Sequence, residues 1–333
     1  ITEPGRRTFP YSSWKESEVS LFRNRISARQ KNIFLIGALS APLSTLAGMD
    51  GWLQTLLAVL IVGVLAFFAC RFQEKLEKPG KWYRIAQILW LVFLLGQLGK
   101  WPAHTWPGGT DFPVVPLTLL ALGVFASLDG GSYAAWCATA LFWLLLILYS
   151  VILFSGLSEW KLKNFTPESG MVSWELLLVL LLPAVVGMLP GERADLRGIA
   201  GVALTAVLPG LWTIGTLTRG VAEQVSWPLY ESVKGMNLFG VAERYEAFVS
   251  VTATMGYFVL FSLLFSGIGT QAEEIPGLGG KKAVGAAGVI SAALVLYIPH
   301  LPGEYLFFGG ILFWLVMPVS ASFIKKSKKR KKL

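Results

Sequence analysis

NIFLIGALSAPLSTLAG, residues 32–48, is an apolar stretch with a glycine, a serine and a proline in its middle. Its length is close to the lower limit for a transmembrane helix, roughly 17–25 residues. Pro and Gly in such a helix free backbone groups at membrane depth, which is tolerated only where those groups are buried in protein or line a cavity. Interrupted helices of this kind form the binding sites of many secondary transporters. We therefore expect an interrupted first span in which Gly37, Ser40 and Pro42 line a ligand site.

The composition of the whole chain is that of a membrane protein. Hydrophobic residues make up 54% of the 333 residues and charged residues only 15%, and the mean hydropathy is +0.59. Soluble domains carry about 25% charged residues. The sequence has two cysteines in apolar stretches and two histidines in predicted loops. It contains no catalytic constellation, phosphate-binding loop or zinc motif, so we expect no enzyme activity, cofactor or metal.

Hydropathy predicts an all-α integral membrane fold with ten transmembrane helices. The membrane domain occupies residues 32–324, between a basic N-terminal tail (1–31) and a basic C-terminal tail (325–333). Each span can cross about 30 Å of hydrocarbon. The predicted spans are 32–48, 51–70, 84–101, 112–128, 132–155, 172–190, 198–218, 245–267, 283–299 and 305–324.

The distribution of cations predicts the orientation. With the N-terminus in the cytoplasm, 23 of the 29 Lys and Arg residues lie in cytoplasmic segments and 6 lie on the other side. This asymmetry follows the positive-inside rule, so we expect both termini to be cytoplasmic and the number of spans to be even. The formal charge of +9 is then a property of membrane topology and lipid contact rather than of nucleic-acid binding.

Ten spans divide into two sets of five, and an odd-numbered repeat places its second copy upside down in the membrane. The sixth span should therefore resemble the first in being interrupted. It contains Pro183 and Gly187 within an apolar stretch, and Pro kinks a helix while Gly permits unusual dihedral angles. We therefore expect a five-plus-five inverted repeat, with Pro183 and Gly187 also lining the ligand site. The alternative is that Gly and Pro are simply more frequent in membrane helices.

Polar residues in the eighth and third spans are further candidates for ligand binding. Ser250, Thr254 and Tyr257 fall on one face of the eighth span, and polar groups in a membrane helix face the interior of the bundle. Gln97 could reach a ligand from the third span. The alternative for each of these residues is an interhelical hydrogen bond, worth about 0.6 kcal/mol.

Several local strings resemble the spore germinant-receptor B subunits, the endospore germination permeases. The resemblance begins with Ile26–Gln30, which precedes the first span, and continues with the Gly48–Trp52 turn into the second helix. It extends through Trp227–Pro228 and Asn237–Gly240 to Arg244–Ala247, which opens the eighth span. The strings occur in the order expected for this family and together cover most of the chain.

The resemblance implies a ten-helix fold of the amino acid–polyamine–organocation transporter superfamily in the inner membrane of a bacterial cell or spore. It also implies a sensor of a small nutrient germinant, such as an amino acid, that works with A and C subunits of the same receptor. Two alternatives remain open at this point. The chain could be a secondary amino-acid transporter, or a transport-dead scaffold that assembles partner subunits.

Overall fold

The computed structural model describes residues 26–75, 80–105, 113–128, 132–156, 160–165, 171–192, 195–234 and 245–322. Within these ranges the chain is helical, apart from turns, loops and an isolated backbone bridge between Ile26 and Gly191. Most of the predicted N-terminal tail and the whole C-terminal tail lie outside the described residues, as do Asn237–Gly240 and Arg244.

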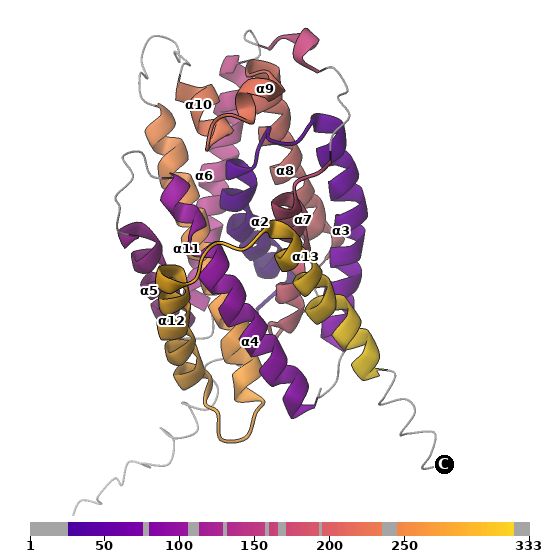
Figure 1. Cartoon of the computed structure of the whole chain (residues 1–333), viewed down its shortest axis with the longest axis vertical. Coiled ribbons are helices and arrows are strands. Elements are labelled where there is room, and N and C mark those ends of the chain that lie inside the picture. Colours follow the sequence, from indigo (N-terminus) through magenta and orange to yellow (C-terminus); the bar gives the residue numbers. More distant parts are fainter. Residues whose placement is uncertain are drawn as a thin grey trace, which may run out of the picture.

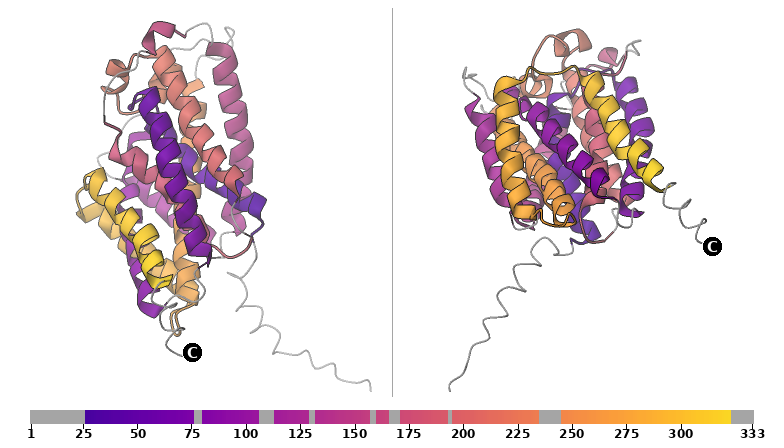
Figure 2. Two further views of the ribbon diagram at one scale, coloured as in Figure 1. Left: turned by 90° about the vertical axis from the view of Figure 1, so that its right-hand side faces the viewer. Right: turned by 60° about the horizontal axis from the view of Figure 1, so that its bottom comes forward.

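Each of the ten predicted spans coincides with a helical segment among the described residues, and together these segments form one bundle (Figures 1 and 2). Short helices η2 (Trp101–Thr105), η4 (Leu162–Asn164), α9 (Arg219–Ala222) and α10 (Pro228–Lys234) lie in the connections. The ten segments are α2 (Ala28–Thr45), α3 (Trp52–Lys75), α4 (Lys81–Leu98), α5 (Val114–Ser127), α6 (Ser132–Gly156), α7 (Trp174–Leu181) continued by η5 (Leu182–Met188), α8 (Leu196–Thr216), α11 (Tyr245–Glu273), α12 (Gly280–Tyr297), and α13 (Gly303–Ile311) continued by η6 (Leu312–Val316).

Seven helices in the described part of the chain are long and apolar enough to cross a membrane. They are α3, α4, α6, α8, α11, α12 and the helix that runs from Gly303 to Ser322. Val114–Ser127 and Trp174–Met188 are shorter apolar helices. The described part of the chain is therefore that of an all-helical membrane protein.

Helix α2 lies in the middle of the bundle (Figure 1). It packs most extensively against α11, α8 and α6, and from Gly37 to Thr45 every residue is buried. Glycines on its neighbours allow this close packing. At Gly256 of α11, an added Cβ would lie 2.7 Å from the Cβ of Ala41. The first predicted span is thus enclosed by protein rather than facing lipid.

The prediction of an interruption in the first span is wrong. Helix α2 is continuous from Ala28 to Thr45 with Pro42 inside it. A proline removes one backbone donor and its ring crowds the backbone carbonyl of the residue four positions earlier, which here is Ala38. Pro42 lies only three residues before the end of the helix, and the hydroxyl of Ser40 donates to the Gly37 carbonyl (2.8 Å). The loss of one hydrogen bond does not break a helix that three neighbours hold in place.

The sixth span does change its conformation. Helix α7 gives way at Leu182 to the 3₁₀ helix η5, which contains Pro183 near its start and Gly187 near its end. In a 3₁₀ helix each backbone hydrogen bond spans three residues instead of four, and there are fewer residues per turn. Every residue of η5 is buried.

Helix α2 is connected to the sixth span at both of its ends. At the start of α2, Ile26 bridges Gly191, and the Lys31 ammonium donates to the Leu189 carbonyl (2.7 Å). We call this the Lys31 end of the bundle. After the end of α2, both carboxylate oxygens of Asp50 accept hydrogen bonds from Ser173, which precedes α7. We call this the Asp50 end. Helix α2 and the α7–η5 segment are therefore antiparallel.

Other contacts between helices also lie at one end of the bundle or the other. At the Lys31 end, Tyr83 at the start of α4 donates to Gln73 near the end of α3 (2.7 Å), and Arg84 pairs with Glu274 after α11. At the Asp50 end, the Trp52 indole donates to the Phe165 carbonyl (3.1 Å). This alternation is what successive membrane crossings produce.

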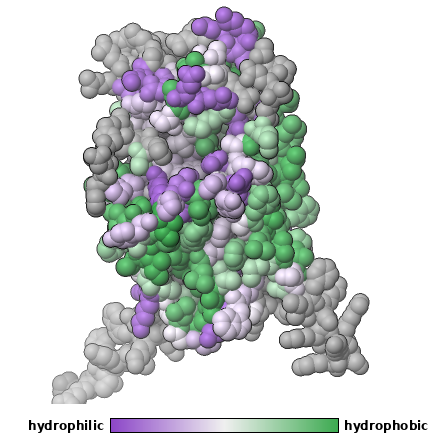
Figure 3. All heavy atoms as spheres, viewed as in Figure 1, coloured by the Kyte–Doolittle hydropathy of each residue, from purple (hydrophilic) through white to green (hydrophobic). Residues whose placement is uncertain are grey.

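The outward faces of the outer helices are apolar. Helix α3 exposes a series of large hydrophobic residues, and α6 exposes a second series. In Figure 3 hydrophobic surface covers the right-hand side, where α3 and α13 lie, and the lower left of the molecule, while hydrophilic residues gather at the top and across the middle of this face. Exposed apolar surface of this extent fits contact with lipid. The α3 series includes Leu57, Leu60, Ile61, Val64 and Phe68.

Candidate functional site

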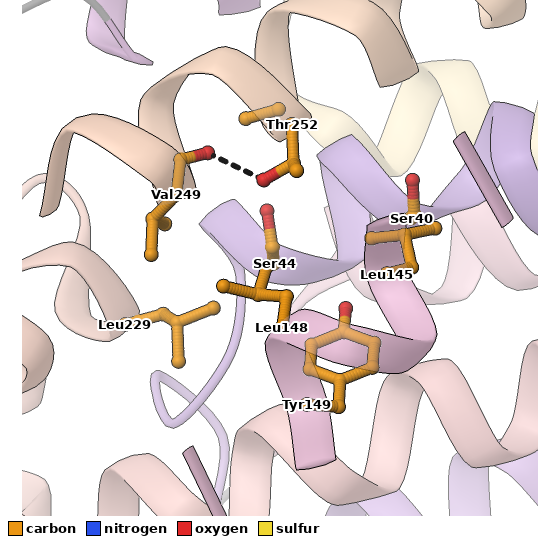
Figure 4. Close-up of a pocket in the computed structure, with 9 residues that line it drawn as sticks. Ser40, Ser44, Leu145, Leu148, Tyr149, Leu229, Val249 and Thr252 are labelled. Carbon is orange, nitrogen blue, oxygen red and sulfur yellow. Dashed lines mark hydrogen bonds between the residues drawn. The ribbon is translucent and has the colours of Figure 1, made fainter. Parts of the chain in front are cut away.

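A small pocket lies where α2, α6, α10 and α11 meet, and it includes Ser40 (Figure 4). Its hydroxyl groups come from Ser40, Ser44, Tyr149 and Thr252, and the rest of its wall is apolar. In Figure 4 the hydroxyls of Ser44 and Thr252 point toward one another. The pocket volume is about 10 Å³, which is room for about one water molecule. As it stands, this pocket cannot accommodate an amino acid.

The hydroxyls around this pocket mostly bond to their own helices. Ser44 donates to the Ala41 carbonyl (2.7 Å), and Thr252 donates to the Val249 carbonyl (2.9 Å). The buried Tyr149 hydroxyl has no hydrogen-bond partner among the described residues, and neither does the hydroxyl of Ser250. The pocket could hold a water molecule that bridges such groups.

The other predicted site residues of α2 and α11 pack between helices or form hydrogen bonds within their own helix. Gly37 packs against α6, where an added Cβ would lie 3.4 Å from the Cβ of Ala138. Thr254 donates to the Ser250 carbonyl (2.8 Å), and the fully buried Tyr257 hydroxyl lies 3.2 Å from the Thr45 hydroxyl. The structure therefore brings Ser40 and Tyr257 into the contact between α2 and α11, where their hydroxyls are already hydrogen-bonded, and Pro42 is buried within α2.

The three remaining predicted residues lie elsewhere. The side-chain amide oxygen of Gln97 accepts a hydrogen bond from the backbone amide of Leu301 (3.0 Å), in the connection between α12 and α13. The side-chain amide nitrogen of Gln97 has no partner among the described residues. Pro183 is buried within η5. Gly187 lines a different and much larger cavity at the Lys31 end.

This larger space, which we call the polar cavity, has a volume of about 310 Å³. Its wall is formed by the start of α2, the end of α3, the start of α4, the residues around the end of η5, and the end of α11. Ligand pockets range from roughly 300 to 1,000 Å³, so this cavity fits a small solute. Its polar lining consists of Lys31, Gln73, Glu74, Tyr83, Thr270, Gln271 and Glu274.

Two opposite charges are buried in the wall of the polar cavity. Lys31 is 1% exposed, and the side chain of Glu74 is 7% exposed. Lys31 directs one N–H at the Leu189 carbonyl, and Glu74 accepts a hydrogen bond from Arg71 (3.2 Å). Removing charged groups from water costs several kcal/mol each unless partners compensate. Such buried charges are characteristic of functional sites in membrane proteins.

Two amide groups add unpaired hydrogen-bonding atoms to the same wall. The Gln73 amide oxygen accepts from Tyr83, but its amide nitrogen has no partner among the described residues. The amide oxygen of Gln271 is also buried without a described partner. Buried polar atoms are normally hydrogen-bonded, so each exception requires an explanation. A polar ligand in the cavity would supply the missing donor and acceptor.

Local sequence features place Lys31 in this wall. Ser27 and Gln30 form a capping box, which starts α2 at Ala28 and places Lys31 in its first turns. Gly191 has a φ of 120° and lies against Ile26, where a side chain would collide with the backbone. This conformation is readily adopted only by glycine. It allows Ile26, just before α2, to pair with the chain after η5.

Sequence reasoning did not single out Lys31, Gln73, Glu74, Tyr83 or Gln271. We treated Lys31 as part of a solvated cytoplasmic tail, and the other four lie near the ends of predicted spans, where polar residues are ordinary. One usable signal was the Ser27–Gln30 pair. A Ser followed three residues later by Gln predicts a helix N-terminus, and this would have placed Lys31 inside the first helix.

No family model matches the chain, and no curated protein matches it significantly.

Proposed function

We propose that this chain is a permease-like membrane protein built from two inverted repeats of five helices, and that it binds a small nutrient solute. When the ten segments are numbered in chain order, moving each helix five places along relates three pairs of contacting helices to three other pairs. The most extensive contact, α2 with α11, has no counterpart of similar extent between the α7–η5 segment and α4. The contact of α2 with α8 corresponds to that of the α7–η5 segment with α3, and the contact of α2 with α6 corresponds to that of α7 with α13. The contact of α5 with α11 corresponds to that of α12 with α4.

The antiparallel arrangement of α2 and the α7–η5 segment also supports this proposal. An inverted repeat relates the first and sixth helices by a two-fold axis in the plane of the membrane, so the two helices must run in opposite directions. The contacts of Lys31 with Leu189 at one end and of Asp50 with Ser173 at the other are those expected for such a pair. In this arrangement the Lys31 end is cytoplasmic, as are both termini.

The position of the polar cavity is the single observation that carries the functional part of the proposal. Helices α2, α3 and α4 of the first repeat and η5 and α11 of the second all contribute to its wall. In transporters with inverted repeats, solute sites lie at the interface of the two repeats near the bilayer midplane. The polar cavity lies at that interface but is displaced toward the Lys31 end. A cavity of solute size with buried charges at that interface favours solute binding over a purely structural scaffold.

The resemblance to spore germinant-receptor B subunits suggests the biological role, which is to sense a small nutrient germinant together with A and C subunits in the spore inner membrane. The test is to delete the gene in the organism of origin and measure dipicolinic acid release from its spores. At least one nutrient mixture should lose its effect, and re-expression should restore it. Normal germination in every nutrient mixture would contradict this role.

A secondary amino-acid transporter is the second candidate. This candidate is favoured because the polar cavity at the Lys31 end is large enough for a solute, whereas the pocket beside Ser40 has a volume of only about 10 Å³. A carrier that alternates access has a solute-sized space open toward one side at a time. The purified protein in proteoliposomes would then accumulate labelled amino acids, whereas a sensor would bind them without net uptake.

A further inference from the structure

We propose that the polar cavity binds a small monocarboxylate that carries a hydroxyl group, with the carboxylate against Lys31 and Gln73 and the hydroxyl against Gln271. This inference rests on the proposed function, because it names the class of solute that the cavity binds. The candidate residues inferred from the sequence around Ser40 and Tyr257 are not part of this site.

Both carboxylates in the wall of the polar cavity already have a cationic partner. Glu74 is paired with Arg71 (3.2 Å) and also accepts a hydrogen bond from the Cys70 thiol (3.8 Å). The second carboxylate of the wall, Glu274, is paired with Arg84. A cationic group is stable in a buried site only where an anion compensates its charge. Neither carboxylate is left to do so for a cationic solute.

Lys31 is the buried charge that a solute would balance. It is 1% exposed, and in the part of the chain that the structure describes its ammonium donates to one group, the Leu189 carbonyl (2.7 Å). A carbonyl accepts a hydrogen bond but carries no net charge. Glu74 attracts Lys31 from a greater distance, but its charge is shared with Arg71. Since an ammonium has three N–H donors, two remain for a bound anion, and one negative charge balances the wall.

Two glutamine side chains add a donor and an acceptor to the same wall. The Gln73 amide oxygen accepts from the Tyr83 hydroxyl (2.7 Å), which leaves its amide nitrogen as a donor without a described partner. The Gln271 amide oxygen is a buried acceptor without a described partner. A carboxylate can accept from both Lys31 and Gln73. A hydroxyl group of the solute can donate to Gln271 and, unlike an ammonium, brings no charge that a carboxylate must balance.

The size and lining of the cavity favour a carboxylate with a short carbon skeleton over an inorganic anion. Its volume of about 310 Å³ is more than a chloride ion occupies and lies at the lower end of the range of ligand pockets. The dianion of phosphate would bring two negative charges to one unbalanced cation. Met188 and Leu189 add apolar surface to the lining, which suits the carbon atoms of an organic acid.

The test is a binding measurement on the purified full-length protein in detergent, with the midpoint of thermal unfolding followed over a range of ligand concentrations. The first set of probes is L-lactate, propionate, which lacks the hydroxyl group, and L-alanine, which has an ammonium in its place. The second set is L-2-hydroxyisovalerate, isovalerate and L-valine. In at least one set the hydroxy acid should raise the midpoint in a saturable manner. The acid without the hydroxyl should bind about fivefold more weakly, because a hydrogen bond is worth about 1 kcal/mol. The amino acid should bind about tenfold more weakly or less.

Substitutions in the wall should affect these ligands differently. Lys31→Gln should weaken binding of the hydroxy acid and of the acid without a hydroxyl equally, by about tenfold or more. Gln271→Met should weaken only the hydroxy acid, so that the two acids bind alike. Gln73→Glu keeps an oxygen that can accept from Tyr83 but replaces the N–H donor with a negative charge, so it should abolish binding of both acids. Purely structural roles of these residues would not produce this dependence on the ligand.

A matched control and two contrary outcomes complete the test. Lys81→Gln changes an exposed cation at the start of α4 and should bind the hydroxy acid as the parent does. Gln271→Met and Gln73→Glu keep the test decisive if Lys31→Gln does not fold. The inference would be overturned if no hydroxy acid shifted the midpoint of the parent, or if the amino acid bound as tightly as the hydroxy acid. Hydroxy-acid binding that survives both Gln271→Met and Gln73→Glu would also overturn it. The proposed function fails separately, through normal germination of the deletion strain.

Discussion

Asp50 ties the end of the first helix to the start of the sixth, and its removal should destabilise the protein strongly. Its two carboxylate oxygens accept hydrogen bonds from the Ser173 amide (2.8 Å) and hydroxyl (2.7 Å), and the residue is 4% exposed. Hydrogen bonds to a charged group are worth about 1.5–3 kcal/mol each. We therefore expect Asp50→Ala to lower the free energy of unfolding by about 3–5 kcal/mol.

A double-mutant cycle isolates the part of this effect that belongs to the pair. The Ser173 hydroxyl is also the N-cap of α7, since it accepts a hydrogen bond from the Leu176 amide (3.4 Å). Ser173→Ala removes that cap together with one bond to Asp50, while its backbone amide remains. The coupling energy between Asp50→Ala and Ser173→Ala should be about 1.5–3 kcal/mol.

Unfolding in mixed micelles, followed by tryptophan fluorescence, measures these free energies. Asp195→Ala is the matched control, because Asp195 also precedes a helix but is exposed and forms no side-chain cap. It should change the unfolding free energy by less than about 0.5 kcal/mol. Additive effects of Asp50→Ala and Ser173→Ala, with a coupling below about 0.5 kcal/mol, would refute the proposed link between α2 and α7.

Three further substitutions, with Gly285→Ala as a control for the first, test the packing around α2 by the same unfolding assay. Gly256→Ala places a methyl group 2.7 Å from the Cβ of Ala41 and should cost about 1–3 kcal/mol, whereas Gly285→Ala on α12 enters open space and should be neutral or stabilising by up to about 1 kcal/mol. Tyr257→Phe removes one buried hydroxyl contact and should cost about 1 kcal/mol. Gly191→Ala forces a side chain into a backbone conformation with φ 120° and should cost at least about 1–3 kcal/mol.

For each of these substitutions, one outcome would contradict the expectation. Equal stability of the Gly256→Ala and Gly285→Ala proteins would mean that α2 and α11 are farther apart than described. A loss well above 3 kcal/mol in Tyr257→Phe would show that its hydroxyl does more than contact Thr45. A neutral Gly191→Ala variant would contradict the pairing of Ile26 with the chain after η5.

The membrane class and the positions of the helices could be predicted from the sequence. Apolar runs long enough to cross a bilayer are a strong signal, and all ten predicted spans coincide with helical segments. The ends of the helices were predicted less accurately. Helix α2 begins four residues earlier than the predicted span, because a capping box rather than hydropathy determines its start.

The conformation of the first span could not be predicted from its Gly and Pro residues. The same kinds of residue accompany a change to 3₁₀ helix at Pro183 but leave α2 intact around Pro42. The difference lies in the surroundings. Helix α2 is packed on three sides by α6, α8 and α11, and its hydroxyls bond to its own carbonyls. Tertiary contacts of this kind are not visible in a local sequence pattern.

Described residues from three of the strings that resemble germinant-receptor subunits have structural roles around α2. Ser27 and Gln30 cap its start. Beyond its end, Gly48 has a φ of 85° and leads to Asp50, which bonds to Ser173. The Trp227 indole donates to the Ser44 carbonyl (3.2 Å). These residues fix the central helix at both ends, so they reflect the architecture more directly than they indicate a ligand.

The polar cavity was missed because its members are ordinary when viewed one at a time. Lys31, Glu74 and Gln271 each lie near the end of a span, where charged and polar residues contact lipid headgroups or water. Only their convergence from α2, α3 and α11 reveals a common wall. That convergence depends on the packing of helices distant in sequence, which hydropathy does not encode.

The most direct test of the account is the accessibility of the polar cavity from the two sides of the membrane. Thr270 lines the cavity and is partly exposed, and Thr270→Cys introduces a thiol of similar size. A membrane-impermeant thiol reagent is applied to inside-out and right-side-out vesicles, with the unsubstituted chain as the background control. We predict rapid labelling in inside-out vesicles only, slowed by the hydroxy acid that binds. Labelling only from the opposite side, or at a rate that this acid does not change, would contradict a cytoplasmic solute site between the two halves.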